Sequence, residues 1–249
     1  MSRLTQYPAV GAISLFQTID PITPTASNYN SQAKTFIGEK FISSDGREFV
    51  LVSAGAVSLA SGKLMQSAAL IADHQNMATS TAAAGDTTVT VTLGATAVTA
   101  NQYAGGFVTF NAGTGAGQTL RIASHPAANG SATLVLTLED AIVTATNSGS
   151  TKSSLAPNPY ADIIVHPTTS TNSPAGVTLY PISATLIGFI QTKGQIACLN
   201  DAGTTIGLGI APSTNTAGAV MTVAATTNQI GSAAYTGTTT EYSLINIRL

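Results

Sequence analysis

The chain has 249 residues, of which 44% are hydrophobic and only 8% are charged, and its formal net charge is −2. Charged residues usually make up about a quarter of a soluble domain, so this surface is polar without being ionic and lacks the clustered Lys and Arg that bind a nucleic acid backbone. The single cysteine excludes an intrachain disulfide and a zinc site of several cysteines, and no apolar run of about 18 residues indicates a membrane helix. We therefore expect no cofactor, no nucleic acid partner and no membrane partner.

Residues 1–33 contain Pro8, Pro21 and Pro24 and show neither the helical nor the strand period. Proline fixes φ and removes a backbone donor, so this segment is predicted to be an extended N-terminal arm. The arm has too many apolar side chains for a solvated tail, and we expect it to lie along its own body or along a neighbouring chain. It makes a poor secretory signal, which favours synthesis in the cytoplasm. The residues of the arm that we expect to contact a partner are Leu4, Tyr7, Val10, Ile13 and Phe16.

Residues 34–78 are predicted to form the first part of a β base domain. Five charged residues lie between positions 39 and 48, and Asp45-Gly46 between two apolar runs is a strong hairpin signal. Glu39 and Arg47 in this stretch are further candidates for partner contact. Residues 68–77 are predicted to form one short helix.

Residues 79–148 are predicted to be a central β-sandwich or barrel, with small polar linkers at 79–85 and 146–154. Residues 87–93 and 132–138 alternate small polar with apolar side chains, which is the strand period. The runs 107–110 and 119–122 flank a glycine-rich stretch, which is typical of a hairpin with an exposed tip at Gly113, Gly115 and Gly117.

Residues 149–249 are predicted to be the second part of the base domain, with a hairpin turn at 192–194. No charged residue lies between Asp201 and Glu241, so we expect this stretch to be ordered by pairing with other strands or subunits. The fold class that follows is all-β, mainly antiparallel, with small sandwich-like or barrel-like domains and little helix. The strands expected in this block are 161–165, 176–180, 184–191, 195–199, 205–210, 219–224 and 240–248.

The sequence offers little that is typical of a catalytic or metal site. The glycines around Gly115 are followed by a strand and have no lysine nearby, so a hairpin tip is favoured over a phosphate loop. His74, His125 and His166 stand apart in sequence; a three-histidine metal site can be built from distant residues, but no closely spaced pair supports one. No Gly-x-Ser-x-Gly motif occurs. We expect a protein that is not an enzyme, with no catalytic, cofactor-binding or metal-binding residues.

Four stretches of the chain carry a resemblance to known proteins: 46–55 together with 59–64, 98–122, 156–160 and 187–194. In these stretches the chain resembles virion structural proteins of tailed bacteriophages, above all the head decoration or cement proteins. The resemblance implies a protein on the outer surface of the phage head, commonly a homotrimer, that clamps adjoining subunits of the major capsid protein and stabilises the capsid. The first and last blocks would then form a base seated on the capsid, and the central block would protrude.

Two other functions stay open at this point. The chain could be a baseplate or fibre subunit of a phage tail whose glycine-tipped domain contacts host glycans. It could also be a glycan hydrolase built on a β scaffold, although its acidic residues are scattered singly.

Overall fold

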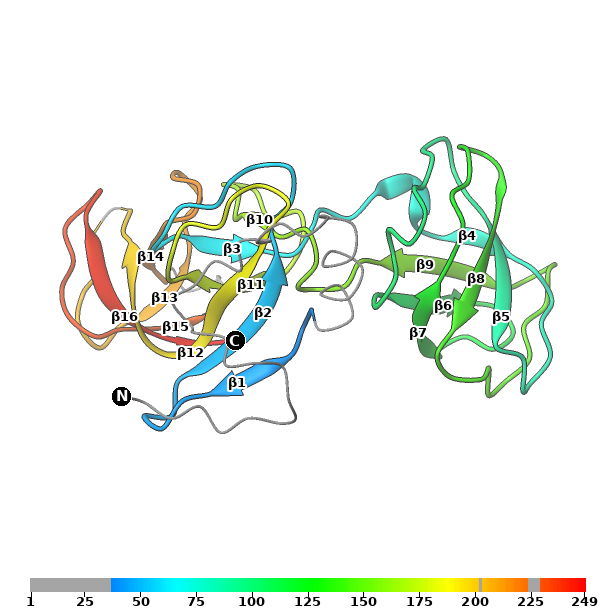
Figure 1. Cartoon of the computed structure of the whole chain (residues 1–249), viewed down its shortest axis with the longest axis horizontal. Helices are drawn as coiled ribbons and strands as arrows, with labels where there is room; N and C mark the ends of the chain where they lie inside the picture. Colours follow the sequence, from blue (N-terminus) through cyan, green and yellow to red (C-terminus); the bar gives the residue numbers. More distant parts are fainter. Residues whose placement is uncertain (1–36, 202, 224–228) are drawn as a thin grey trace, which may run out of the picture. The chain divides into compact units, whose positions relative to one another are not determined.

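The computed structural model describes residues 37–201, 203–223 and 229–249, and in this part the chain is almost entirely antiparallel β structure. Two compact units are present, which we call the sheet unit (residues 37–68 and 159–249) and the barrel unit (residues 69–158) (Figure 1). The all-β prediction is confirmed. The arm expected at 1–33 lies outside the described residues. The barrel unit, residues 69–158, extends beyond both ends of the central block expected at 79–148.

The barrel unit is a closed six-stranded antiparallel barrel with the order β4-β5-β8-β7-β6-β9. It forms because its strands alternate: Leu134, Leu136 and Leu138 of β8 point into the core, while Val135 points outward and is 46% exposed. Phe110 and Tyr103 fill the same core. The strands are β4 (Met77–Thr79), β5 (Thr88–Thr92), β6 (Phe107–Ala112), β7 (Thr119–Ser124), β8 (Thr133–Leu138) and β9 (Lys152–Ala156).

Two predictions for the ends of this unit were wrong. Residues 68–77 do not form a helix: a single 3-10 turn at Ala72–His74 leads directly into β4. The segments expected to be linkers at 79–85 and 146–154 lie inside the barrel unit, where Thr79 belongs to β4 and residues 152–154 belong to β9. Strands β4 and β9 pair with each other and close the barrel. Their small polar side chains serve this pairing, and the hydroxyl of Thr79 donates to that of Ser153 inside the barrel at 2.8 Å.

The sheet unit is a ten-stranded antiparallel sheet built from both ends of the chain. Eight strands follow the order β10-β3-β11-β12-β16-β15-β13-β14, and β2 joins β12 while β1 joins β2. The strands are β1 (Lys40–Ile42), β2 (Glu48–Ser53), β3 (Leu64–Gln66), β10 (Ile164–Val165), β11 (Pro174–Thr178), β12 (Ile187–Leu199), β13 (Gly209–Pro212), β14 (Val220–Thr222), β15 (Gly231–Ala233) and β16 (Tyr242–Arg248).

Strand β12 corrects the hairpin turn expected at 192–194. It runs without a turn for 13 residues, pairing with β2 from Ile187 to Lys193 and with β16 from Lys193 to Leu199. The register of its pairing with β2 shifts between Gln191 and Lys193, and Gly194 has a φ of 96°. Lys193 and Gly194 therefore mark a bulge in β12, at the point where its pairing passes from β2 to β16.

Leu136→Ala is expected to lower the free energy of unfolding of the barrel unit by about 2–5 kcal/mol, because it leaves a cavity at a fully buried position. Val135→Ala, on the outward face of the same strand, is the matched control and should cost well under half as much. Urea unfolding followed by circular dichroism measures both. Equal losses would contradict the inward and outward assignment of β8.

Candidate partner-contact surface

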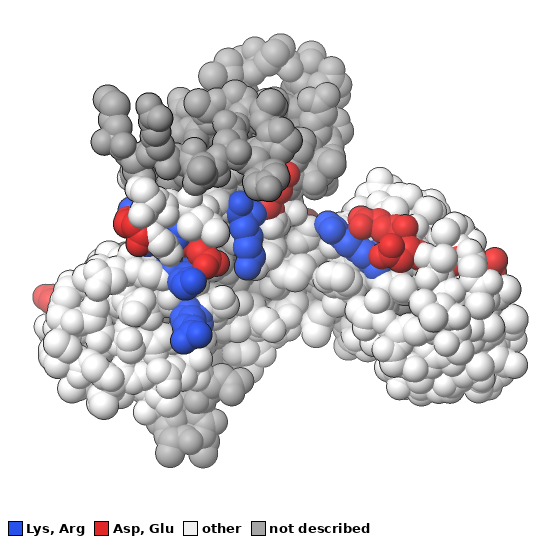
Figure 2. All heavy atoms as spheres, turned by 90° about the horizontal axis from the view of Figure 1, so that it is seen from below, with Lys and Arg blue, Asp and Glu red and all other residues white. Residues whose placement is uncertain are grey.

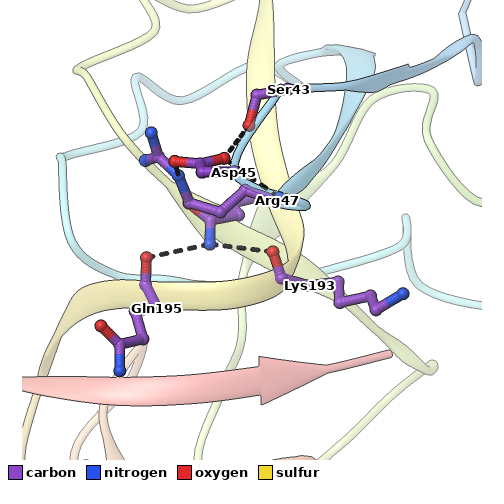
Figure 3. A network of polar contacts seen from close by, with 6 residues as sticks. Ser43, Asp45, Arg47, Lys193 and Gln195 are labelled. Carbon is purple, nitrogen blue, oxygen red and sulfur yellow. Dashed lines mark hydrogen bonds and ion pairs between the residues drawn. The ribbon is translucent and has the colours of Figure 1, made fainter.

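Five charged residues of the sheet unit lie in or beside the hairpin of β1 and β2. The turn predicted at Asp45-Gly46 is present, with the Ser43 N–H donating to the Arg47 carbonyl at 2.9 Å and Gly46 at a φ of 81°. The carboxylate of Asp45 accepts hydrogen bonds from the Ser43 hydroxyl and from Nε of Arg47, the latter at 2.7 Å (Figure 3). Ser43 first, and then Arg47, lower the pKa of Asp45 to about 2. The turn therefore presents a fixed ion pair to solvent.

A second ion pair joins this hairpin to the long strand β12. Nζ of Lys193 lies 2.7 Å from Oε1 of Glu48, and its hydrogen bond holds the pKa of Glu48 below the usual range. Arg248 of β16 lies opposite Lys193 in the register, and it is exposed. Charged side chains from three adjacent strands thus form one polar row. Figure 2 also shows a second group of charged side chains, and the barrel unit contains the ion pair of Arg121 and Glu139.

Gln191 fixes the bulge of β12 beneath this row. Its Nε2 donates to the carbonyls of Lys193 and Gln195, each at 3.0 Å, as Figure 3 shows for the two acceptors. Gln191 is fully buried, and its Oε1 has no hydrogen-bond partner. The bulge therefore places Lys193 beside Glu48 at a defined position.

The predicted contact residues are only partly placed by the structure. Glu39 and Arg47 both belong to the β1–β2 hairpin region, where Glu39 is exposed and Arg47 is half-buried over the ring of Phe49. No pattern in the sequence indicated the roles of Lys193 and Gln191, because these roles depend on the pairing of β12 with the distant strand β2. The arm candidates Leu4, Tyr7, Val10, Ile13 and Phe16 lie outside the described residues.

The glycine tip between β6 and β7 is held against a neighbouring loop of the barrel unit. Gly113, Gly115 and Gly117 all have positive φ, as the hairpin prediction requires, and Gly113 and Gly117 are exposed while Gly115 is half-buried. The backbone of Gly113 runs so close to the carbonyl of Ser150 that a Cβ would lie 2.1 Å from its oxygen. Gln118 also accepts from the N–H groups of residues 143 and 144. The tip is therefore a pinned turn rather than a free loop.

The three histidines serve buried hydrogen-bond networks in two different units. In the barrel unit His74 contacts the Tyr103 hydroxyl at 2.6 Å, and the backbone N–H of Tyr103 donates to Nε2 of His125 at 2.9 Å. Burial lowers the pKa of His125 and raises that of Tyr103 to about 12. His166 belongs to the sheet unit.

His125 and His166 repeat one local arrangement. In each, Nδ1 lies 2.8 Å from the carbonyl of the proline that follows, so Nδ1 donates and Nε2 is left as the acceptor. Burial lowers the pKa of His166 as well. Both imidazoles are thus used as neutral structural groups.

Two further features were sought in the part of the chain that the structure describes: groups of metal-ligating side chains and membrane-spanning helices. Across residues 37–201, 203–223 and 229–249, no group of three or more His, Cys, Asp and Glu side chains is arranged to hold a metal ion. Within the same ranges no helix has the length and apolar character needed to cross a bilayer.

Comparison with known proteins places the chain in no family. No family model, no curated protein and no solved structure matches it.

Gly113→Ala is expected to destabilise the barrel unit by several kcal/mol, because the new Cβ meets the Ser150 carbonyl in addition to straining a residue at a φ of 78°. Gly117→Ala is the control: its φ is 92° but nothing lies within 4 Å of the new Cβ, so only the backbone strain of about 1–2 kcal/mol applies. Thermal unfolding of the two variants makes the comparison. If both variants lost the same stability, the tip would not be pinned.

The stability of the protein is expected to fall as the pH drops below about 6.5, the ordinary pKa of histidine. The folded-state pKa values of His125 and His166 lie below their unfolded values, so the unfolded chain binds more protons in this range; the stabilisation is complete above the unfolded pKa and is lost on acidification. Urea midpoints measured across this range test the expectation. His125→Gln, which keeps an acceptor for the Tyr103 N–H, should flatten the pH dependence of the barrel unit, and an unchanged slope would exclude this histidine as its source.

Proposed function

We propose that the protein is a structural virion protein that decorates the head of a tailed bacteriophage and stabilises the capsid by bridging subunits of the major capsid protein. It acts as a homotrimer on the outer surface of the head, and it is not an enzyme. The resemblance of four stretches of the sequence to decoration proteins supports this role. The structure adds support of a different kind, because a charge-poor antiparallel surface can be covered by another protein with little loss of ion solvation.

The observation that carries the proposal is the group of charged side chains at the β1–β2 hairpin, on a sheet unit with few other charges. Two ion pairs, Asp45–Arg47 and Glu48–Lys193, stand together on a protein with few charges. Charged groups at the rim of an interface fix its register and speed association, while an uncharged area supplies the contact. The sheet unit is therefore the part that binds the capsid, with Glu39, Arg47 and Lys193 at its rim, and residues 1–33 reach a neighbouring subunit.

The role of a tail component with a glycan-binding tip has less support. The tip at Gly113–Gly117 is held by hydrogen bonds from Gln118 and by the close approach of residue 150, which leaves little freedom to enclose a ligand. The number of copies per virion separates the two roles. Quantitative mass spectrometry of purified virions should find this chain in numbers comparable with the major capsid protein, and a ratio lower by a factor of ten or more would favour the tail.

Arg47→Glu is expected to weaken binding to capsids that lack this protein by about tenfold or more, because it places a like charge beside Asp45 at the rim of the interface. Arg121→Glu is the matched control, since Arg121 forms a comparably exposed ion pair with Glu139 in the barrel unit. Exposed pairs contribute about 0–1 kcal/mol to folding, so both variants should stay folded. Sedimentation with capsids measures the binding, and equal losses for the two variants would refute the sheet unit as the capsid-binding part.

A further inference from the structure

The outward side of the ladder between β12 and β16 changes in character along its length. Side chains alternate along each strand, and Ile196 and Cys198 of β12 lie in the core of the sheet unit with Ile245 of β16. The residues between them therefore point to the other side, which we call the ladder face. It is cationic at one end, then polar, and apolar over its second half. In that order, the outward pairs are Lys193 with Arg248, Gln195 with Asn246, Ala197 with Leu244 and Leu199 with Tyr242.

The apolar half of the ladder face is open to solvent. Tyr242 is 51% exposed, Ala197 is also exposed, and Leu199 and Leu244 are half-buried. The barrel unit is covered differently, because the outward positions of β5 and β8 are all threonine except for Val135. Contiguous apolar residues bordered by polar ones mark an interaction site on a soluble protein. The ladder face therefore has the composition of a contact area.

Tyr242 is held in place before any partner binds. Its ring lies against the backbone at Gly62, where an added Cβ would lie 2.6 Å from a ring carbon. Its own backbone is fixed by pairing with Leu199. A side chain fixed in this way loses little conformational entropy when it becomes buried, and tyrosine is among the residues that dominate binding energy at protein interfaces. Tyr242 is therefore suited to anchor an interface.

The cationic end of the ladder face sets the charge that a partner must bring. Lys193 forms an ion pair with Glu48. Arg248 is exposed and takes part in none of the ion pairs found among the described residues. Two cations thus stand beside one carboxylate, and a second carboxylate on the partner would neutralise the excess.

The same face of a second copy does not fit here. Two copies in a two-fold contact are related by an axis that lies in the plane of the contact. With the axis along the strands, the cationic ends face each other and repel. With the axis across the strands, Arg248 is buried against the apolar half without a counter-charge, which is costly. A different surface, with a carboxylate beside apolar side chains, matches both halves of the ladder face.

We propose that the ladder face is the capsid-binding area of the sheet unit, and that it fits a surface of the major capsid protein on which a carboxylate lies beside apolar side chains. The carboxylate pairs with Arg248, and the apolar side chains cover Tyr242 and Leu244. The ion pair of Glu48 and Lys193 makes this area continuous with the charged β1–β2 hairpin. The inference rests on the proposed role in the virion and adds the contact area and the chemistry of its partner.

The first test measures binding of the full-length protein to purified capsids that lack it, by sedimentation. Ala197→Glu puts a carboxylate on the apolar half at an exposed position, so the fold is kept and the affinity should fall about tenfold or more. Ala123→Glu, at an exposed outward position of β7 in the barrel unit, is the matched control and should bind like the unchanged protein.

The outcomes separate this inference from the proposed function. Equal binding of Ala197→Glu and the unchanged protein would overturn the ladder face as the contact area and leave the role in the virion standing. An unchanged protein that does not bind capsids would overturn both.

A second variant tests the charge of the partner. Arg248→Glu should weaken capsid binding about tenfold at low salt, and the loss should shrink at high salt because ions screen the repulsion between the two carboxylates. Arg121→Glu in the barrel unit is the control and should show neither effect. A loss that is the same at low and high salt would contradict the pairing of Arg248 with a carboxylate.

Hydroxyl-radical labelling read by mass spectrometry locates the contact without a substitution. Labelling of Tyr242 should fall about threefold or more when the protein binds capsids, because the centre of an interface excludes water. Val143 of the barrel unit is 76% exposed and should keep its labelling rate. Unchanged labelling of Tyr242 on the capsid would overturn the inference. So would a free protein whose oligomers dissociate in Ala197→Glu, as measured by sedimentation velocity, because the ladder face would then join copies of this chain.

Discussion

The pairing of β12 with both β2 and β16 is the constraint on which the sheet unit depends. Its first half pairs with β2, which precedes the barrel unit in the chain, and its second half pairs with β16 near the C-terminus. Without this strand the two separate stretches of sequence that build the unit would lose their longest common ladder. The bulge at Gln191–Lys193 lets one strand serve both partners, and the same bulge places Lys193 beside Glu48. The architecture and the polar row of the candidate surface thus share one cause.

The scarcity of charge has consequences for packing as well as for recognition. Several Ser and Thr side chains form hydrogen bonds inside the protein. Examples are the Thr79–Ser153 contact within the barrel and the Ser243–Asn200 contact within the sheet unit. Ser and Thr can be buried in this way because each needs only one or two partners. The few ion pairs therefore stand out against a surface that another protein could cover at low cost in desolvation.

Local signals in the sequence were enough to predict the hairpins, and they failed where partners are distant. Asp45-Gly46 and the glycines at 113–117 mark turns whose two strands are neighbours in the chain, and both hairpins are present. Thr192–Gly194 has the composition of a turn, but β2 and β16 hold it extended. The small polar stretches near 79 and 150 have the composition of linkers, but they lie inside the barrel unit, next to the paired strands β4 and β9 that close it. The roles of Glu39 and Arg47 could be guessed from charge density, whereas Gln191 shows its role only through the carbonyls that its amide reaches.

In the sequence, the barrel unit lies between the two segments that build the sheet unit, and this sets an order of events during synthesis. Glu48 of β2 and Lys193 of β12 are 145 positions apart. At a synthesis rate of roughly 5–20 residues per second, the apolar strand β2 leaves the ribosome on the order of 10 s before its partner β12. Meanwhile the hairpins of the barrel can close on their own, and the pairing of β4 with β9 brings the two ends of the insert together. A folded insert shortens the effective loop that β2 and β12 must close, which lowers its entropic cost. The barrel unit thereby acts as an intramolecular tether that favours the pairing of β2 with β12.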